Sequence, residues 1–142
     1  MEKFDYASFW GRFGAWMADQ LITAPAYYIL MILIAAAYPE SDQAEVEVGV
    51  FALATALYWI YFAGFNSSSW QATPGKRLFG YKVVDLNGNQ IDFAVATKQH
   101  FATILSTIPL FFGFLMIFWT KRRQGLHDIL AKTVVIKRHE SE

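Results

Sequence analysis

The longest apolar stretch of the chain does the most to limit what the chain can fold into. Residues 21–39 carry no formal charge, and the apolar run that contains them begins near Ser8. A helix needs about 20 mostly apolar residues, each rising ~1.5 Å, to cross the hydrocarbon core of a bilayer. We therefore predict that residues 8–38 form a first membrane-spanning helix.

Two charged side chains interrupt this predicted helix near its start. An ionised carboxylate inside a membrane helix costs roughly 2.5 kcal/mol or more, so Asp19 is expected to face protein or water and to have a partner. Arg12 lies seven positions earlier, close to two helical turns, and therefore on the same face. Thr23 and Tyr27 extend this polar face and are candidates for lining a pathway.

A second apolar run follows an acidic loop. Residues 48–65 are uncharged and long enough for a second span. The preceding loop, residues 38–47, contains four carboxylates and neither Lys nor Arg. Because Lys and Arg are concentrated in cytoplasmic loops, this loop is expected outside the cell and the N-terminus inside.

Composition supports a membrane protein and argues against several other classes. The 142 residues are 55% hydrophobic, more than is usual in a soluble domain, and their length fits a single domain, 1–142. A net charge of zero gives no argument for nucleic acid. The chain has no cysteine, and its three histidines lack the spacing of metal ligands. We expect no metal, no cofactor and no enzymatic activity.

The pattern then changes from helical to strand-like. Residues 77–92 are rich in β-branched and aromatic residues around the turn dipeptide Asn87-Gly88, which predicts a β-hairpin. A two-stranded ribbon alone is only marginally stable, so residues 133–137 are expected to join the hairpin as a third strand. Three cations gather at the hairpin and are predicted to contact anionic lipid head groups, or else to be solvated: Lys76, Arg77 and Lys82.

A third apolar segment, residues 93–120, is interrupted by Pro109 and Gly113. A single span would place the basic residues 121–123 outside and would separate the two strand regions. We therefore predict a broken or re-entrant pair of half-helices, residues 93–107 and 108–120, too short to cross. Three plain spans are the alternative.

A short helix is predicted at residues 124–132. Asp128 lies in its first turn, where the positive end of the helix dipole stabilises a carboxylate.

Three blocks of the sequence, in order, carry a resemblance to a known family. FWGRFGAWMADQLI, TPGKRLFGYKVVDLNG and LHDILAKTVVI resemble the conserved blocks of the RDD family, and Arg12, Asp19 and Asp128 match the residues that give it its name. The resemblance implies a small multi-pass protein of the bacterial plasma membrane. A few members of that family are described as cation/proton antiporters, so the resemblance implies transport only weakly.

Two functional hypotheses follow. In the first, Asp19 alternately binds a proton and a monovalent cation while Arg12 tunes its protonation, and the protein is an antiporter. One subunit has too few helices to enclose a pathway, so this hypothesis requires a homo-oligomer. In the second, Arg12, Asp19 and Asp128 form one buried ionic network that fastens the first helix to the C-terminal segment. The protein would then be a non-transporting scaffold or a binding module for a partner protein or lipid.

Overall fold

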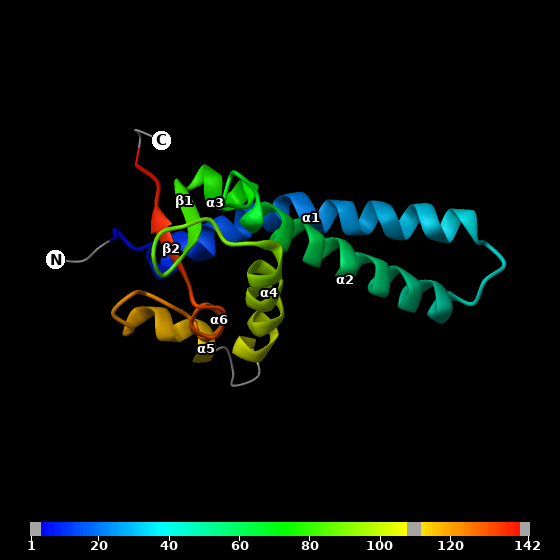
Figure 1. The fold of residues 1–142 in the computed structure, drawn as a ribbon. Helices are drawn as coiled ribbons and strands as arrows, with labels where there is room; N and C mark the ends of the chain where they lie inside the picture. Colours follow the sequence, from blue (N-terminus) through cyan, green and yellow to red (C-terminus); the bar gives the residue numbers. More distant parts are fainter. Residues whose placement is uncertain (1–3, 108–111, 140–142) are drawn as a thin grey trace.

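Two long helices form an arm that projects from a smaller cluster of elements (Figure 1). The computed structural model describes residues 4–107 and 112–139. Helix α1 spans Phe9–Ala37 and α2 spans Gln43–Ser67. Side-chain oxygens of Ser8 and Asp42 cap their N-termini by accepting hydrogen bonds from backbone N–H groups of the first turn. Both helices are long and apolar enough to cross a membrane.

The remaining elements gather at the end of the arm where α1 begins and α2 ends (Figure 1). We call these elements, from α3 to β2, the cap. In order they are α3 (Pro74–Leu78), β1 (Tyr81–Asp85), α4 (Phe93–Thr107), α5 (Phe112–Leu115), the 3-10 helix η1 (Met116–Phe118), α6 (Leu126–Ala131) and β2 (Thr133–Lys137).

The cap contains a two-stranded antiparallel sheet. Strand β1 pairs with β2 in a register that places Val83 opposite Val135, and both side chains are buried. On one face they pack with Ala15 of α1 and Ala63 of α2, which joins the sheet to the arm. The two long helices and the cap therefore share a hydrophobic core at this end of the molecule.

The prediction of a three-stranded sheet built on a hairpin at residues 77–92 is wrong. The strand at 133–137 is present, but it pairs directly with β1, and the described residues after Gly88 form no second hairpin strand. The carboxylate of Asp85 instead accepts hydrogen bonds from the backbone N–H groups of Asn87 and Asn89. This closes a local turn around Asp85, and the chain then enters α4.

The start of the predicted hairpin is helical. Thr73 caps the N-terminus of α3 through its side chain, and Pro74 occupies the first turn, where its missing N–H costs nothing. The sequence TPGK therefore begins a short helix, and the strand begins only at Tyr81.

The third apolar segment is broken, as predicted. The axes of α4 and of the segment Phe112–Phe118 differ by 113°, so the segment is not the straight third span of the alternative. The predicted start of the second half at Ile108, and Pro109, lie outside the described residues. Helix α4 packs between α2 and α6, which connects the arm to the C-terminal part of the cap.

Candidate functional site

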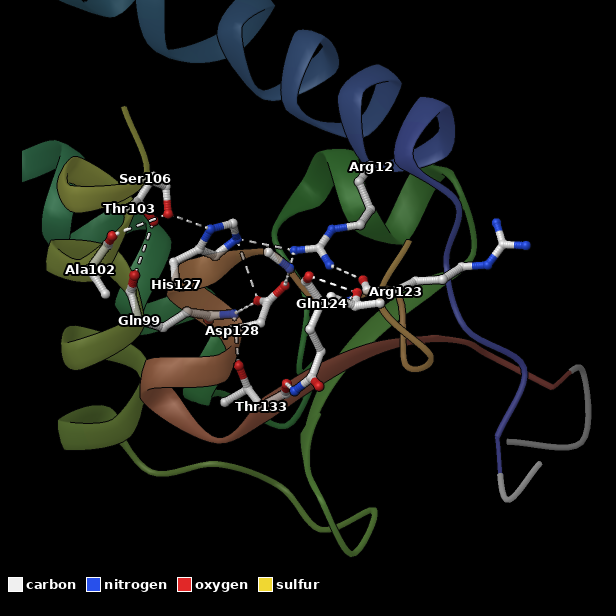
Figure 2. Close-up of polar contacts among 12 residues, drawn as sticks. Arg12, Gln99, Ala102, Thr103, Ser106, Arg123, Gln124, His127, Asp128 and Thr133 are labelled. Carbon is white, nitrogen blue, oxygen red and sulfur yellow. Dashed lines mark hydrogen bonds and ion pairs between the residues drawn. The ribbon is translucent and has the colours of Figure 1, made fainter. Parts of the chain in front are cut away.

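Asp128 lies fully buried in the first turn of α6, where a salt bridge joins it to the first long helix (Figure 2). The Nη2 atom of Arg12 is 2.6 Å from its Oδ2 atom. The other guanidinium nitrogen, Nη1, donates to the backbone carbonyl of Arg123 at 3.1 Å. The same Asp128 oxygen accepts from the backbone N–H of Gly125 at 3.1 Å, which caps α6. One arginine therefore ties α1 both to α6 and to the loop before it.

His127 extends this contact into the cap. Its Nε2 atom lies 3.2 Å from Nη2 of Arg12, and its Nδ1 atom lies 3.1 Å from the hydroxyl of Ser106. A guanidinium only donates hydrogen bonds, so Nε2 accepts and Nδ1 carries the proton. The N–H at Nδ1 then donates to Ser106, whose hydroxyl donates to the carbonyl of Ala102 at 3.3 Å. Ser106 is fully buried, and this chain of donors holds it in a structural role.

Gln99 of α4 completes the surroundings of Asp128. Its Nε2 atom donates to Asp128 Oδ1 at 2.8 Å and to Thr133 Oγ1 at 3.1 Å. Among the described residues, Gln99 Oε1 is the only buried side-chain polar atom without a hydrogen bond. Arg12, His127, Asp128 and Gln99 are called the ionic network below.

The charges of the ionic network follow from burial and proximity. Burial alone would raise the pKa of Asp128, but the Arg12 guanidinium and the hydrogen bond from Gln99 outweigh it and lower this pKa to about 2. Burial lowers the pKa of His127 to about 4, and Arg12 reinforces this, whereas Asp128 opposes it. At neutral pH the network therefore holds one cation, one anion and a neutral imidazole.

Asp19 occupies a second, separate buried site at the junction of α1, α2 and α3. Its Oδ1 atom accepts from the Tyr61 hydroxyl at 2.9 Å and from the backbone N–H of Gly75 at 2.8 Å. Its Oδ2 atom accepts from the Thr73 hydroxyl at 2.6 Å. Among the described residues, no Lys or Arg forms an ion pair with Asp19, so three neutral donors stabilise the carboxylate. Asp19 and these donors are called the neutral clamp below.

Gly75 is required by the neutral clamp. A Cβ atom at this position would collide with the carbonyl oxygen of Ala15 and would lie 2.7 Å from Asp19 Cγ. The absent side chain lets the α3 backbone approach α1 closely enough to donate its N–H to the carboxylate.

Of the three residues predicted to form one network, the structure brings Arg12 and Asp128 together and gives Asp19 other partners. Among the described residues, no hydrogen bond or ion pair joins Arg12, the candidate partner, to Asp19, so the three do not form one network. Two helical turns separate the two side chains along α1, so each meets a different part of the cap.

The partners of the two sites were not predicted from the sequence. The threonine and glycine of the TPGK motif gave a usable signal, because an N-cap and a glycine often mark a backbone that binds an anion. Tyr61 and Gln99 gave none, because a polar side chain within a helix has many possible partners.

Thr23 and Tyr27, which were predicted to line a pathway, are among the residues that line a crevice, and the pathway itself stays a prediction. The crevice has a volume of about 680 Å³ and lies between α1 and α2, with Thr23, Tyr27 and Tyr61 among its lining residues. The hydroxyl of Thr23 donates to the carbonyl of Asp19 at 3.1 Å. Tyr61 therefore connects this crevice to the neutral clamp.

The cations predicted to contact head groups have different surroundings. Lys76 is half-buried, and its ammonium group donates to Asn66 Oδ1 at 3.1 Å. Burial lowers the pKa of Lys76 to about 8, and the nearby Arg12 adds to this effect. The Arg77 guanidinium stacks 4.3 Å above the Trp70 ring, and Lys82 lies on β1.

The chemistry available at the two sites is limited. Among the described residues, no group of three or more His, Asp or Glu side chains is placed to hold a metal ion. Ser106, His127 and Asp128 lie in sequence along one set of contacts, and all three side chains are buried. The arrangement fixes elements to one another.

Comparison with known proteins places the chain in a family. The sequence model of the RDD family matches residues 6–132, which include Arg12, Asp19 and Asp128. A Bacillus subtilis (strain 168) protein named uncharacterized protein YxaI is 33% identical, over 92% of this chain and 96% of its own length. No solved structure matches the chain. The family and the two apolar helices together indicate a membrane protein. This chain belongs to the RDD family.

Proposed function

We propose that the chain is a multi-pass protein of the bacterial plasma membrane, with α1 and α2 crossing the bilayer and the cap on the cytoplasmic side. Residues 38–47, which form the loop between these helices and the acidic start of α2, contain no Lys or Arg, whereas the cap is rich in both. The start of α1 exposes Trp10 and Trp16, which suit the boundary between lipid and water.

Single-cysteine labelling tests this orientation, because the chain has no cysteine of its own. Ser41→Cys places a thiol in the loop between the long helices, and His139→Cys places one beyond β2. With an impermeant maleimide on intact cells, we expect labelling only at position 41, and labelling at position 139 only after permeabilisation. The reverse pattern would invert the topology.

Within this membrane protein, we propose that the cap is a rigid cytoplasmic platform for a partner protein, so that the chain acts as a scaffold. The observation that carries the proposal is that both buried carboxylates are fully occupied by protein groups. Asp128 is neutralised by Arg12, and Asp19 accepts from three donors. Each site bonds α1 to a different part of the cap, and together they fix the orientation of the cap relative to the helices.

A second candidate function is an oligomeric cation/proton antiporter. The crevice between α1 and α2 supports it, because Tyr61 both lines this crevice and donates to Asp19. A proton exchanged at Asp19 could pass through this hydroxyl. Two long helices do not enclose a pathway, so this function requires several copies of the chain.

Flux in proteoliposomes separates the two functions. Purified wild type, Asp19→Asn and the control Thr55→Val would be compared with an internal pH dye under sodium, lithium and potassium gradients. Thr55 is an exposed residue of α2 that bonds only the carbonyl of Phe51. The scaffold predicts no cation-dependent proton movement in any of the three. Movement in wild type and Thr55→Val, lost in a folded Asp19→Asn, would overturn the scaffold and support the antiporter.

A further inference from the structure

A cleft of about 440 Å³ opens between the first turn of α1 and the segment that follows η1. No residue of the ionic network, the neutral clamp or the crevice between the long helices is among its lining residues. Its lining combines aromatic rings with two cations and contains no carboxylate: Ser8, Phe9, Trp10, Ile117, Phe118, Trp119, Thr120, Lys121 and Arg123.

The basic side of the cleft is fixed in place. Arg123 adopts a left-handed backbone with φ of +48°, and its carbonyl accepts from Arg12 at 3.1 Å. The Thr120 hydroxyl accepts from the backbone N–H of Gln124 at 2.7 Å and donates to its carbonyl at 2.9 Å. Figure 2 shows the Arg123 side chain extending away from Arg12, while the carbonyl faces it. The turn therefore presents its cations from a braced backbone.

The aromatic side of the cleft is strongly exposed. The exposed fraction is 69% for Trp10, 56% for Trp119 and 55% for Phe118, although each of the three rings contacts another aromatic ring. Exposed tryptophans are favoured at the level of lipid head groups, where an apolar ring meets a polar layer. The uncharged part of α1 begins only a few turns further along the chain.

We propose that this cleft binds the phosphate head group of one anionic phospholipid. Lys121 and Arg123 supply positive charge to the phosphate, and the rings of Trp10 and Trp119 lie against the glycerol and the first carbons of the acyl chains. The site is distinct from the cations predicted from the sequence to contact head groups. The proposal of this lipid site depends on the proposed cytoplasmic placement of the cap. It does not depend on whether the protein is a scaffold or an antiporter.

Native mass spectrometry of the full-length protein in detergent tests the site. Wild type would be mixed with equal amounts of phosphatidylglycerol and phosphatidylcholine carrying identical acyl chains. The cleft variant is Lys121→Gln/Arg123→Gln, and the matched control is Lys98→Gln/Arg122→Gln. The control removes one exposed Lys and one exposed Arg that do not line the cleft, so both variants lose the same charge.

We expect wild type and the control to retain one phosphatidylglycerol in preference to phosphatidylcholine. The cleft variant should bind it about 30-fold more weakly, since each cation at a membrane surface contributes roughly fivefold. Equal retention by the two variants, with matching thermal melts, would overturn the proposal. Free glycerol phosphate is included as a competitor. If it displaces the lipid at equal concentration, the site is a simple anion site rather than a lipid site.

A failure of the membrane orientation is recognised separately. Cysteine labelling at positions 41 and 139 reports the orientation without reference to lipid, and the flux assay reports transport. If wild type shows no preference for phosphatidylglycerol while the labelling pattern is as expected, this site alone is disproved.

Discussion

The two buried carboxylates solve the same structural problem by different means. Asp128 belongs to the cap and meets a cation supplied by α1, whereas Asp19 belongs to α1 and meets neutral donors supplied by α2 and by the chain around α3. In the ionic network the charge is cancelled, at the cost of removing two ions from water. In the neutral clamp only one charge is buried, and directed dipoles stabilise it. The first site depends on charge balance, and the second depends on the shape of a backbone.

The largest effect is expected from breaking the charge balance. Arg12→Leu leaves the Asp128 carboxylate buried and unpaired, which should destabilise the protein by about 3–5 kcal/mol. The measurement is the thermal midpoint in detergent. Unfolding is monitored by circular dichroism and by size-exclusion chromatography of heated samples. Arg122→Leu is the control, because Arg122 is exposed. Similar losses in both variants would show that hydrophobic replacement, rather than the ionic network, determines the result.

Acid should weaken the ionic network. The folded-state pKa of His127, about 4, lies below its usual 6.5, so between these values the unfolded chain binds more protons than the folded one. Stability is therefore full above pH 6.5 and falls as the pH drops toward 4, by at most about 3 kcal/mol. Asp128 adds a further loss only below its usual pKa of 3.8.

The check is the thermal midpoint between pH 7 and 4.5 for wild type, His127→Gln and His139→Gln. Wild type and His139→Gln should lose stability over this range, and His127→Gln should show a flatter profile from a lower starting value. Parallel profiles for all three proteins would assign the acid sensitivity to other groups.

The neutral clamp should be sensitive to shape instead. Gly75→Ala forces a methyl group against the Ala15 carbonyl and the Asp19 carboxylate, and it should cost about 2 kcal/mol. Gly64→Ala is the matched control, because a Cβ atom there meets open space and alanine favours the helix. We expect a lower thermal midpoint for the first and an equal or higher one for the second. An unchanged thermal midpoint for Gly75→Ala would mean that α3 does not pack closely against α1.

The fold was predictable wherever a long apolar pattern determined it. The uncharged runs predicted both long helices, and Gly113 lies in the bent segment that follows α4. The predicted hairpin was wrong because Asn87-Gly88 satisfies a turn signal equally well when the carboxylate of Asp85 closes the turn by itself. A local signal specified the turn, but the pairing of β1 depended on a strand some 50 residues away.

The candidate site was predictable only in its charges. An Asp inside a predicted membrane helix needs a partner, and this reasoning identified Asp19 and Arg12. Asp128 came from its place in the first turn of a helix and from the family resemblance. It could not assign the partners correctly, because neutral donors such as a tyrosine hydroxyl or a backbone N–H carry no sequence signature. Spacing along α1 made Arg12 the obvious partner for Asp19, whereas the close approach of Gly75 provided a better one.

Tyr61→Phe should have the smallest effect on stability, and it tests most directly whether the neutral clamp and the ionic network are independent. Tyr61→Phe removes one of the three hydrogen bonds to Asp19 and should lower stability by about 1 kcal/mol, whereas Tyr28→Phe, at an exposed position, should change nothing. Because no contact joins Tyr61 to the ionic network among the described residues, Tyr61→Phe and Arg12→Leu should be additive within about 0.5 kcal/mol. Arg12→Leu and Asp128→Leu should be strongly non-additive, since the second change removes the carboxylate left unpaired by the first. If the effects of Tyr61→Phe and Arg12→Leu depart from additivity by clearly more than about 0.5 kcal/mol, the two carboxylate sites act as one unit.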